Sequence, residues 1–396
     1  MFEFAENYSV GQFANGDYWV HNDGNDVVIT GISPASYEDA GRIKNGTMIN
    51  PANSANQGYD SSPRDMTYEA TLNRDPGITG QSMVVPAGSS VIKSISMQSD
   101  AGRPIISDAV VLTVLAGAPP QGAFRPPYSG GDKAIIATAS DLDFSQLGSF
   151  ARLGGEPDLA DLTASVARVW LEHCTQWIQR DIHPQNNMPA YGRDLAMTSG
   201  RGLLALQLDY SDAEKQMLLI HLVQYGLDIY GIAREGGQWN ANGGHNLGRK
   251  LPLLLAGKVL HNDDILAYAD AAQHFIFHDD QQHFYVSQVE VDMTHSSAWN
   301  PDDRADPIPY EVADIGMPEW GIRHFDRPAA DNRAWGATYR NVNGYSQTTH
   351  VFAARLMGAQ DMWNWPALFD YADRFYETES QGFPDYFQTL WDAYRN

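Results

Sequence analysis

Cysteine is the scarcest residue type in this chain, because Cys174 stands alone among 396 residues. A single cysteine cannot form a disulfide within the chain, which excludes a fold stapled by disulfides. The neighbours of Cys174 are apolar at helical spacing, so we expect inert core packing, with a reactive thiol as the alternative.

Long hydrophobic runs and a surplus of basic residues are also missing. No stretch approaches the roughly 18 consecutive apolar residues that cross a bilayer, so no membrane span is predicted. The 26 Lys and Arg residues face 49 Asp and Glu residues, which gives a net charge of −23. This balance argues against nucleic acid as a partner, because phosphates attract a basic surface. An anionic ligand stays compatible, since a site can be locally basic in an acidic protein.

The first part of the chain, to about residue 118, has the composition of a β-sandwich. Short β-branched runs alternate with clusters of Asn, Asp, Gly, Ser and Pro. The expected strands cover residues 18–21, 27–32, 82–85, 90–96 and 109–115.

Residues 119–157 are expected to connect two domains. Residues 119–131 hold four prolines and three glycines, which predicts a stiff connector. Its Phe124, Arg125 and Tyr128 are expected to pin the two domains together, and lining one end of a cleft is the alternative.

From residue 158 to 396 the apolar spacing becomes helical. Ser211 and Glu214 form a capping box that predicts the start of one helix. The expected helices cover residues 158–177, 211–230, 194–208, 245–260, 263–278, 346–358, 364–377 and 384–394. Helices of this length, joined by aromatic-rich loops, favour an (α/α) toroid, an incomplete helical barrel. The predicted fold class is therefore a multidomain α+β protein, with long loops at 279–300 and 301–335 that are expected to be functional.

The most informative segment is the glycine-rich stretch 236–250, which gathers an aromatic side chain, amides, a histidine and two cations. Loops on a rigid scaffold commonly carry function. Asn, His and Arg together suit the task of neutralising a carboxylate while a proton is removed beside it. We interpret the segment as the floor of a sugar-acid site.

A second polar cluster covers residues 310–324 and 331–345. Its aromatic side chains can stack on sugar rings, and its arginines can bind carboxylates through two hydrogen bonds. The alternative is a loop tied down by its own hydrogen bonds and by tryptophan packing.

The order of polar residues in the two clusters resembles that of the toroid polysaccharide lyases, such as alginate, chondroitin and glucuronan lyases. The similarity lies in Asn242 with His245, followed further along by Arg333 with Tyr339. It implies an anionic polysaccharide substrate and β-elimination. No cofactor or metal is expected. Asn242 and Arg333 would neutralise the carboxylate, Tyr339 would be base or acid, and His245 base or orienter.

We expect a secreted or periplasmic protein. The acidic N-terminus lacks a signal pattern, so either the protein is not secreted or a leader is absent from this sequence. Tyr310 and Tyr345 are reserve candidates for the tyrosine role. The residues expected to contact substrate are Trp239, Asn240, Arg249, Tyr310, Trp320, Arg323, His324, Arg340 and Tyr345.

Two other functions fit the composition. A glycoside hydrolase would use paired carboxylates, with Glu311, Asp314 and Glu319, or Asp181 near His183, as candidates. A carbohydrate-binding protein without catalysis would explain the tryptophans but not the grouping of His, Asn, Arg and Tyr.

A metal site is the remaining alternative. His274 and His278 are spaced for one face of a helix, and His283 follows. No glutamate follows the first histidine, so we expect a solvated helix end with a polar cap.

Overall fold

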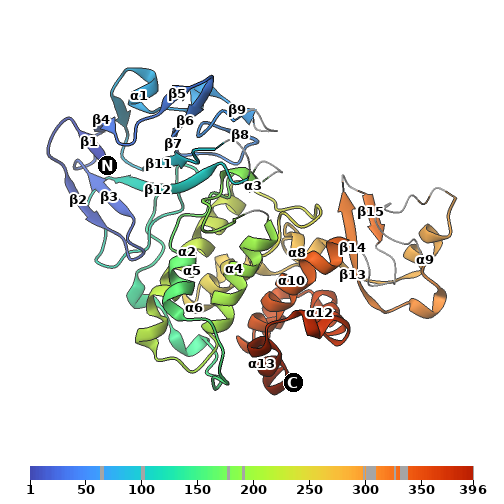
Figure 1. Ribbon diagram of the computed structural model, residues 1–396. Coiled ribbons are helices and arrows are strands. Elements are labelled where there is room, and N and C mark those ends of the chain that lie inside the picture. The colour runs from blue at the N-terminus through green and yellow to red at the C-terminus, as the bar shows by residue number, and fades with distance from the viewer. Residues whose placement is uncertain are drawn as a thin grey trace.

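The computed structural model describes residues 1–62, 67–99, 103–175, 179–189, 192–297, 299, 309–324, 327–330 and 338–395. Within these ranges only the backbone is described at 67, 179, 180, 322–324, 327–330, 338, 339 and 341. The chain is of the α+β class, with its sheets in the N-terminal part and most helices after them (Figure 1).

The N-terminal part forms two larger sheets and two small ones. One sheet has the strand order β1-β4-β10, and the other has the order β2-β3-β12-β11-β7. Strand β3 pairs with β12 in parallel, whereas its other neighbour, β2, is antiparallel. The bounds are β1 Phe2–Phe4, β2 Ser9–Gln12, β3 Tyr18–His21, β4 Val27–Ile32, β5 Tyr37–Asp39, β6 Arg42–Lys44, β7 Thr47–Ile49, β8 Asn56–Gln57, β9 Thr67–Tyr68, β10 Met83–Val85, β11 Ser89–Ser96 and β12 Ile106–Leu115.

One apolar core joins the two larger sheets. Val27 and Ile29 of β4 belong to the same buried cluster as Val20 of β3 and Val114 of β12. Val27 and Ile29 are two residues apart and therefore point to one face of their strand. The five strands expected from β-branched runs are confirmed, because β3, β4, β10, β11 and β12 lie at those positions.

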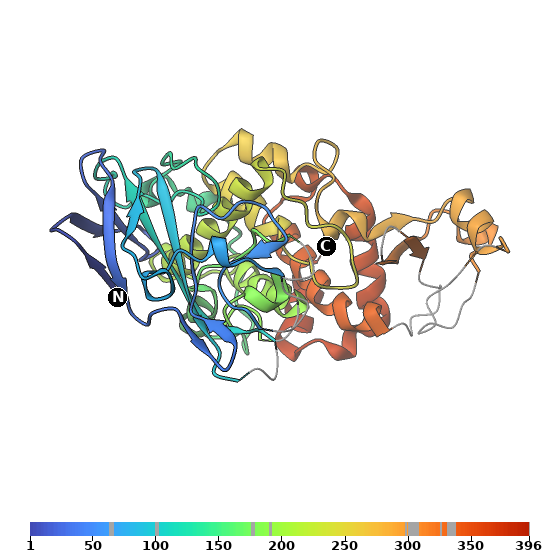
Figure 2. The same cartoon turned by 90° about the horizontal axis from the view of Figure 1, so that it is seen from above.

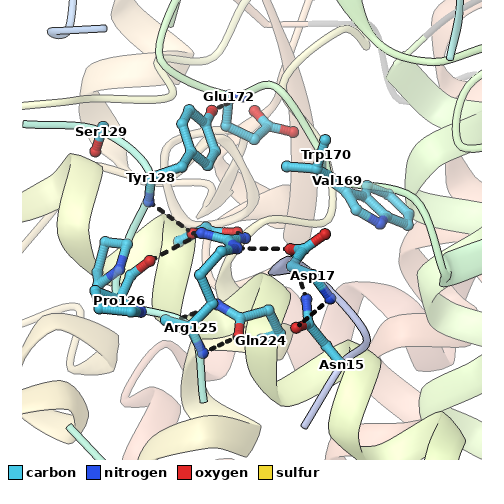
Figure 3. A network of polar contacts seen from close by, with 12 residues as sticks. Asn15, Asp17, Arg125, Pro126, Tyr128, Ser129, Val169, Trp170, Glu172 and Gln224 are labelled. Carbon is cyan, nitrogen blue, oxygen red and sulfur yellow. Dashed lines mark hydrogen bonds and ion pairs between the residues drawn. The ribbon is translucent and has the colours of Figure 1, made fainter. Parts of the chain in front are cut away.

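The connector after β12 ties the sheets to the helices through a buried arginine (Figure 3). Arg125 Nε donates to Asp17 Oδ2 at 2.6 Å, in the turn before β3. Its Nη1 donates to Asp228 Oδ1, on helix α5, at 2.9 Å. Phe124 and Tyr128 beside it are buried as well. The expected pinning role of Arg125 is confirmed.

The rest of the chain is mainly helical, and between residues 160 and 270 its described part contains helices and no strand. The capping box of Ser211 and Glu214 begins α5 as expected. The bounds are α1 Pro76–Thr79, α2 Leu159–Val166, α3 Gln179–Ile182, α4 Gly192–Ala205, α5 Asp212–Arg234, α6 Lys250–Val259, α7 Asp263–Ala269, α8 His278–Gln281, α9 Gln288–Thr294, α10 Thr338–Leu356, α11 Gln360–Trp363, α12 Pro366–Glu379 and α13 Asp385–Tyr394. Of the helices in the described ranges, none is at once long enough and apolar enough to cross a membrane.

The helices lie between two β-rich ends (Figure 2). The N-terminal sheets occupy one end of the molecule. A small sheet of β13 (His283–Tyr285), β14 (Pro318–His324) and β15 (Arg327–Ala330) lies toward the other, with α9 beyond it. The prediction of long irregular loops at 279–300 and 301–335 is thus partly wrong, because these segments contain the three strands and the short helices α8 and α9.

Two expected helices stop early because the chain makes non-helical hydrogen bonds instead. The helix expected at 158–177 ends at Val166; further along, the backbone N–H groups of Glu172 and His173 donate to Tyr128 Oη at 2.6 and 3.1 Å. The helix expected at 263–278 ends at Ala269, where the Asp270 carboxylate accepts from the Ala272 N–H at 2.9 Å.

Candidate functional site

The polar loop between α5 and α6 runs from Glu235 to Arg249, the residues that flank the two helices. Helix α5 ends where Gly236 takes a φ of +83°, a conformation that glycine adopts without strain. The Trp239 ring stacks on Phe277 with centroids 5.4 Å apart. The helix expected at 245–260 therefore begins only at Lys250, because the residues before it form this loop.

Both ends of the loop are fixed to one buried carboxylate, Glu172. Arg249 Nε lies 3.1 Å from each of its oxygens, and Trp239 Nε1 donates to Oε2 at 3.0 Å. Tyr225 Oη donates to Oε1 at 3.0 Å, and His183 Nε2 lies 3.1 Å from the same oxygen. Burial alone would raise the pKa of Glu172, but Arg249 and His183 lower it well below its usual value.

Trp239 and Arg249 therefore support the loop from its buried side. Both side chains are fully buried, and both hydrogen-bond to Glu172. Arg249 also donates to two carbonyl oxygens of the loop, those of His245 and Leu247, at 3.0 and 2.6 Å. The expectation that Trp239 and Arg249 contact substrate is not supported, because neither presents surface to a ligand.

His245 lies at the centre of the loop with its ring orientation fixed. Its Nδ1 is 2.9 Å from the carbonyl oxygen of Asn242. A carbonyl only accepts, so Nδ1 carries the hydrogen, and in the neutral ring Nε2 keeps the basic lone pair. The backbone of His245 lies against Gly192 at the start of α4, where a Cβ would come within 2.0 Å of the His245 oxygen. His245 is 1% exposed.

The loop contacts the first part of α10. Asn343 Nδ2 donates to the Gly243 carbonyl oxygen at 3.2 Å, and Gly244 lies directly against the same amide. Tyr339 is four residues before Asn343 in the helix, which places it one turn away on the same helical face. The Tyr339 side chain and Arg333 lie outside the described residues.

Behind the loop lie two adjacent buried carboxylates. The Gly248 N–H lies 3.3 and 3.2 Å from the two oxygens of Asp279. Asp280 pairs with the buried Lys250 at 2.7 Å and accepts from Trp363 Nε1 at 2.7 Å. Burial, and secondarily the charge of Asp280, raise the pKa of Asp279 to about 7.

Several members of the second polar cluster are buried in a network of their own. Arg340 Nη2 donates to Glu319 at 3.1 Å, and Arg374 Nη1 lies 3.4 Å from the other Glu319 oxygen. Tyr310, Trp320 and Arg340 have no exposed surface. Their expected contact with substrate is therefore not supported, and the charge of Arg340 is already balanced.

The two reserve tyrosines lie away from the loop. Tyr310 belongs to a small apolar cluster beside β13. The Tyr345 ring lies 5.2 Å from Phe375 and 4.8 Å from Phe383, two residues past Asn343 and so on the far side of α10. Arg323 and His324 are in β14, and their side chains lie outside the description.

The carboxylates proposed for hydrolysis have other partners. Glu311 and Asp314 cap each other in a short helical turn, with the Glu311 N–H donating to Asp314 at 2.8 Å. Asp181 is fully buried on α3, and Glu319 is paired with arginines.

The histidine group expected at a solvated helix end is arranged differently. His278, Asp279 and Asp280 are buried, so the prediction of a solvated helix end is wrong. His274 precedes α8, is not on one helix with His278, and stacks on Tyr268 with centroids 4.1 Å apart. In the part of the chain that is described, no group of three or more His, Cys, Asp or Glu residues is placed to hold a metal ion. Burial raises the pKa of the Cys174 thiol to about 12, which agrees with inert packing.

Sequence reasoning missed Glu172 and Asn343. Glu172 interrupts an apolar run, and a charge in such a run is expected to need a buried partner. Asn343 was missed because the helix expected at 346–358 begins earlier, at Thr338, which places Asn343 one turn after Tyr339.

Comparison of the chain with protein-family models, with curated proteins and with solved structures found no match.

Proposed function

We propose that this chain is a polysaccharide lyase that cleaves a uronic-acid polymer by β-elimination. The reacting groups are Asn242, His245, Arg333 and Tyr339, at the loop between α5 and α6 and the start of α10. One observation carries the proposal: the His245 ring is oriented by the Asn242 carbonyl, in a loop that Asn343 holds one turn from Tyr339.

The reaction needs a neutralised carboxylate before it needs a base. The C5 proton of a uronic acid is weakly acidic, and donors on the adjacent carboxylate stabilise the enolate-like transition state by about 2.7–4 kcal/mol each. A base removes that proton, the electron pair forms the C4–C5 double bond, and the C4–O bond breaks. An acid then protonates the leaving glycosidic oxygen, and no water is consumed.

His245 suits the base or the orienting role through its tautomer. A neutral imidazole with Nδ1–H held by a carbonyl presents Nε2 as the acceptor. Tyr339 takes the complementary role of acid or base. Because His245 is 1% exposed, a polymer reaches Nε2 only when the chain that covers it moves.

We assign the substrate carboxylate to amides that have surface for a ligand and to two arginines. Asn240 is exposed and Asn242 half-buried, so both amides have surface for a ligand. Arg249 and Arg340 are balanced by Glu172 and Glu319, so we assign the positive charge of the site to Arg323 and Arg333 instead.

The architecture proposed with this function is a β-sandwich over residues 1–118, a connecting segment over 119–157 and an (α/α) toroid over 158–396. The shared core of the two N-terminal sheets supports the first part. The proposed substrate is a polymer outside the cytoplasm, so the protein is proposed to be secreted or periplasmic.

The test is absorbance near the ultraviolet edge during incubation with alginate, glucuronan, hyaluronan, chondroitin and ulvan. The proposal predicts an unsaturated, absorbing product from at least one polymer, and loss of that product in His245→Gln. His261→Gln is the matched control, because His261 is exposed and lies on the turn after α6. New reducing ends without absorbance would favour hydrolysis, and no cleavage of any polymer would contradict the proposal.

A further inference from the structure

Helix α10 carries three polar side chains in a row on one face: Asn343, Gln347 and His350. They are spaced four and three residues apart, which places them on the same side of a helix. Gln347 is 3% exposed, and the other two are at most 1% exposed. A buried polar stripe of this kind needs partners for its hydrogen-bonding atoms.

The polar loop crosses this stripe. Asn343 Nδ2 donates to the Gly243 carbonyl, and a Cβ added to Gly248 would lie 3.0 Å from His350 Cε1. Gln347 lies between these two contacts along the helix. It therefore faces the part of the loop, residues 244–247, that includes His245.

The amide of Gln347 has no partner for either of its polar atoms among the described residues, and Asn343 Oδ1 has none either. Two other buried glutamines, Gln224 and Gln207, have partners for both of their polar atoms. Gln224 accepts from the Arg125 N–H and donates to the Arg125 carbonyl, both at 2.9 Å (Figure 3). Gln207 accepts from the Gly148 N–H at 2.8 Å and donates to the Leu203 carbonyl at 3.0 Å. Gln347 differs from these two structural glutamines because neither its Nε2 donor nor its Oε1 acceptor has a partner among the described residues.

We propose that Gln347, together with Oδ1 of Asn343, binds hydroxyl groups of the sugar ring whose carboxylate lies at the His245 loop. This inference rests on the proposed function. An amide donates and accepts, which matches neighbouring ring hydroxyls, and it carries no charge to attract the carboxylate. Gln347 and Asn343 thus bind the uncharged hydroxyl groups of the uronic acid, while Asn242 and Arg333 neutralise its carboxylate.

The test combines thermal unfolding with kinetics in Gln347→Met, which keeps an unbranched chain of similar length. Removing an unpaired buried amide is neutral or stabilising, so Tm stays or rises. Losing two hydrogen bonds to hydroxyls raises KM by about tenfold or more, with kcat changed by less than about threefold. Thr348→Val is the matched control, because Thr348 is also buried on α10 and its hydroxyl has no partner in the described part of the chain. It is expected to leave KM unchanged.

The outcomes separate the two proposals. If the wild type makes an unsaturated product and KM is unchanged in Gln347→Met, the hydroxyl site is refuted and the lyase stands. If no polyuronate gives that product, the lyase proposal falls and the hydroxyl site falls with it. A lowered Tm in both Gln347→Met and Gln347→Leu would show a structural glutamine and would also refute the site.

Discussion

Arg249 and Glu172 form a fully buried ion pair, with the arginine Nε 3.1 Å from both carboxylate oxygens across 77 residues of sequence. Trp239 donates to the same carboxylate from the other end of the loop. The loop that carries Asn242 and His245 is thus fastened at both ends to one acid. This arrangement makes the loop a fixed platform rather than a flexible connection.

Arg249→Met tests whether that pair holds the fold together. The substitution leaves Glu172 charged and buried without its main partner, which costs about 3–5 kcal/mol. We expect the free energy of unfolding, measured with denaturant, to fall by this amount. Arg152→Met is the control, because Arg152 and Asp209 form a half-exposed pair whose loss costs at most about 1 kcal/mol. Equal losses of unfolding free energy in both variants would contradict a stabilising role of the Arg249–Glu172 pair.

Gly244→Ala tests the contact between the loop and α10. A Cβ at this position would lie 2.2 Å from Asn343 Oδ1, so the Asn343 amide or the loop must shift and their contact is lost. We expect kcat/KM to fall by at least about tenfold, since a misplacement of about 1 Å costs up to 10²-fold. Gly131→Ala is the control: a Cβ there meets nothing within 4 Å, and activity should be retained. Full activity in Gly244→Ala would show that this contact does not position the site.

Asp279→Asn tests the buried carboxyl behind the loop. The raised pKa of Asp279, about 7, means that the folded protein keeps a proton which the unfolded chain loses above about pH 4. Unfolding releases that proton between about pH 4 and 7, so the wild type loses stability as pH rises through this window. Asn stays neutral and still accepts from the Gly248 N–H.

The stability of Asp279→Asn relative to wild type should therefore increase with pH across the window, by at most about 1.4 kcal/mol per pH unit. Chemical denaturation of both proteins at several pH values measures this difference. A difference that is flat between pH 4 and 7, or that falls, would show that Asp279 is ionised throughout.

Tyr339→Phe tests the proposed acid or base. Removing a group that transfers a proton lowers kcat by about 10²–10⁴-fold. Substrate affinity should change little, as for a group that acts mainly in the transition state. Tyr345→Phe should retain activity, because Tyr345 packs on Phe375 and Phe383 on the other side of α10. The reverse pattern would transfer the role to Tyr345.

Local signals in the sequence located much of the fold. The β-branched runs located β3, β4, β10, β11 and β12, because β-branched residues are enriched in strands. Ser211 and Glu214 located the start of α5 through hydrogen bonds within one turn.

The partners of buried charges could not be predicted in the same way. Arg249 was expected to contact substrate, but it pairs with Glu172, and no local pattern indicates which distant acid it selects. The helix expected at 158–177 ends at Val166, and backbone groups of the next residues bond to Tyr128 in the connector. The polar composition of residues 236–250 did indicate an organised loop, although Trp239 and Arg249 support it from inside.

The most direct test of the lyase proposal is mass spectrometry of a defined uronic-acid oligosaccharide cleaved in heavy-oxygen water. Elimination consumes no water, so the two fragments together must have the mass of the parent and contain no heavy oxygen. Hydrolysis adds one water, so the fragments would together exceed the parent by that mass, and one would carry the label. The β-elimination account predicts wild-type fragments that together have the mass of the parent, and formation of these fragments about 10²–10⁴-fold more slowly by Tyr339→Phe. Wild-type fragments that together exceed the parent by one water would contradict it.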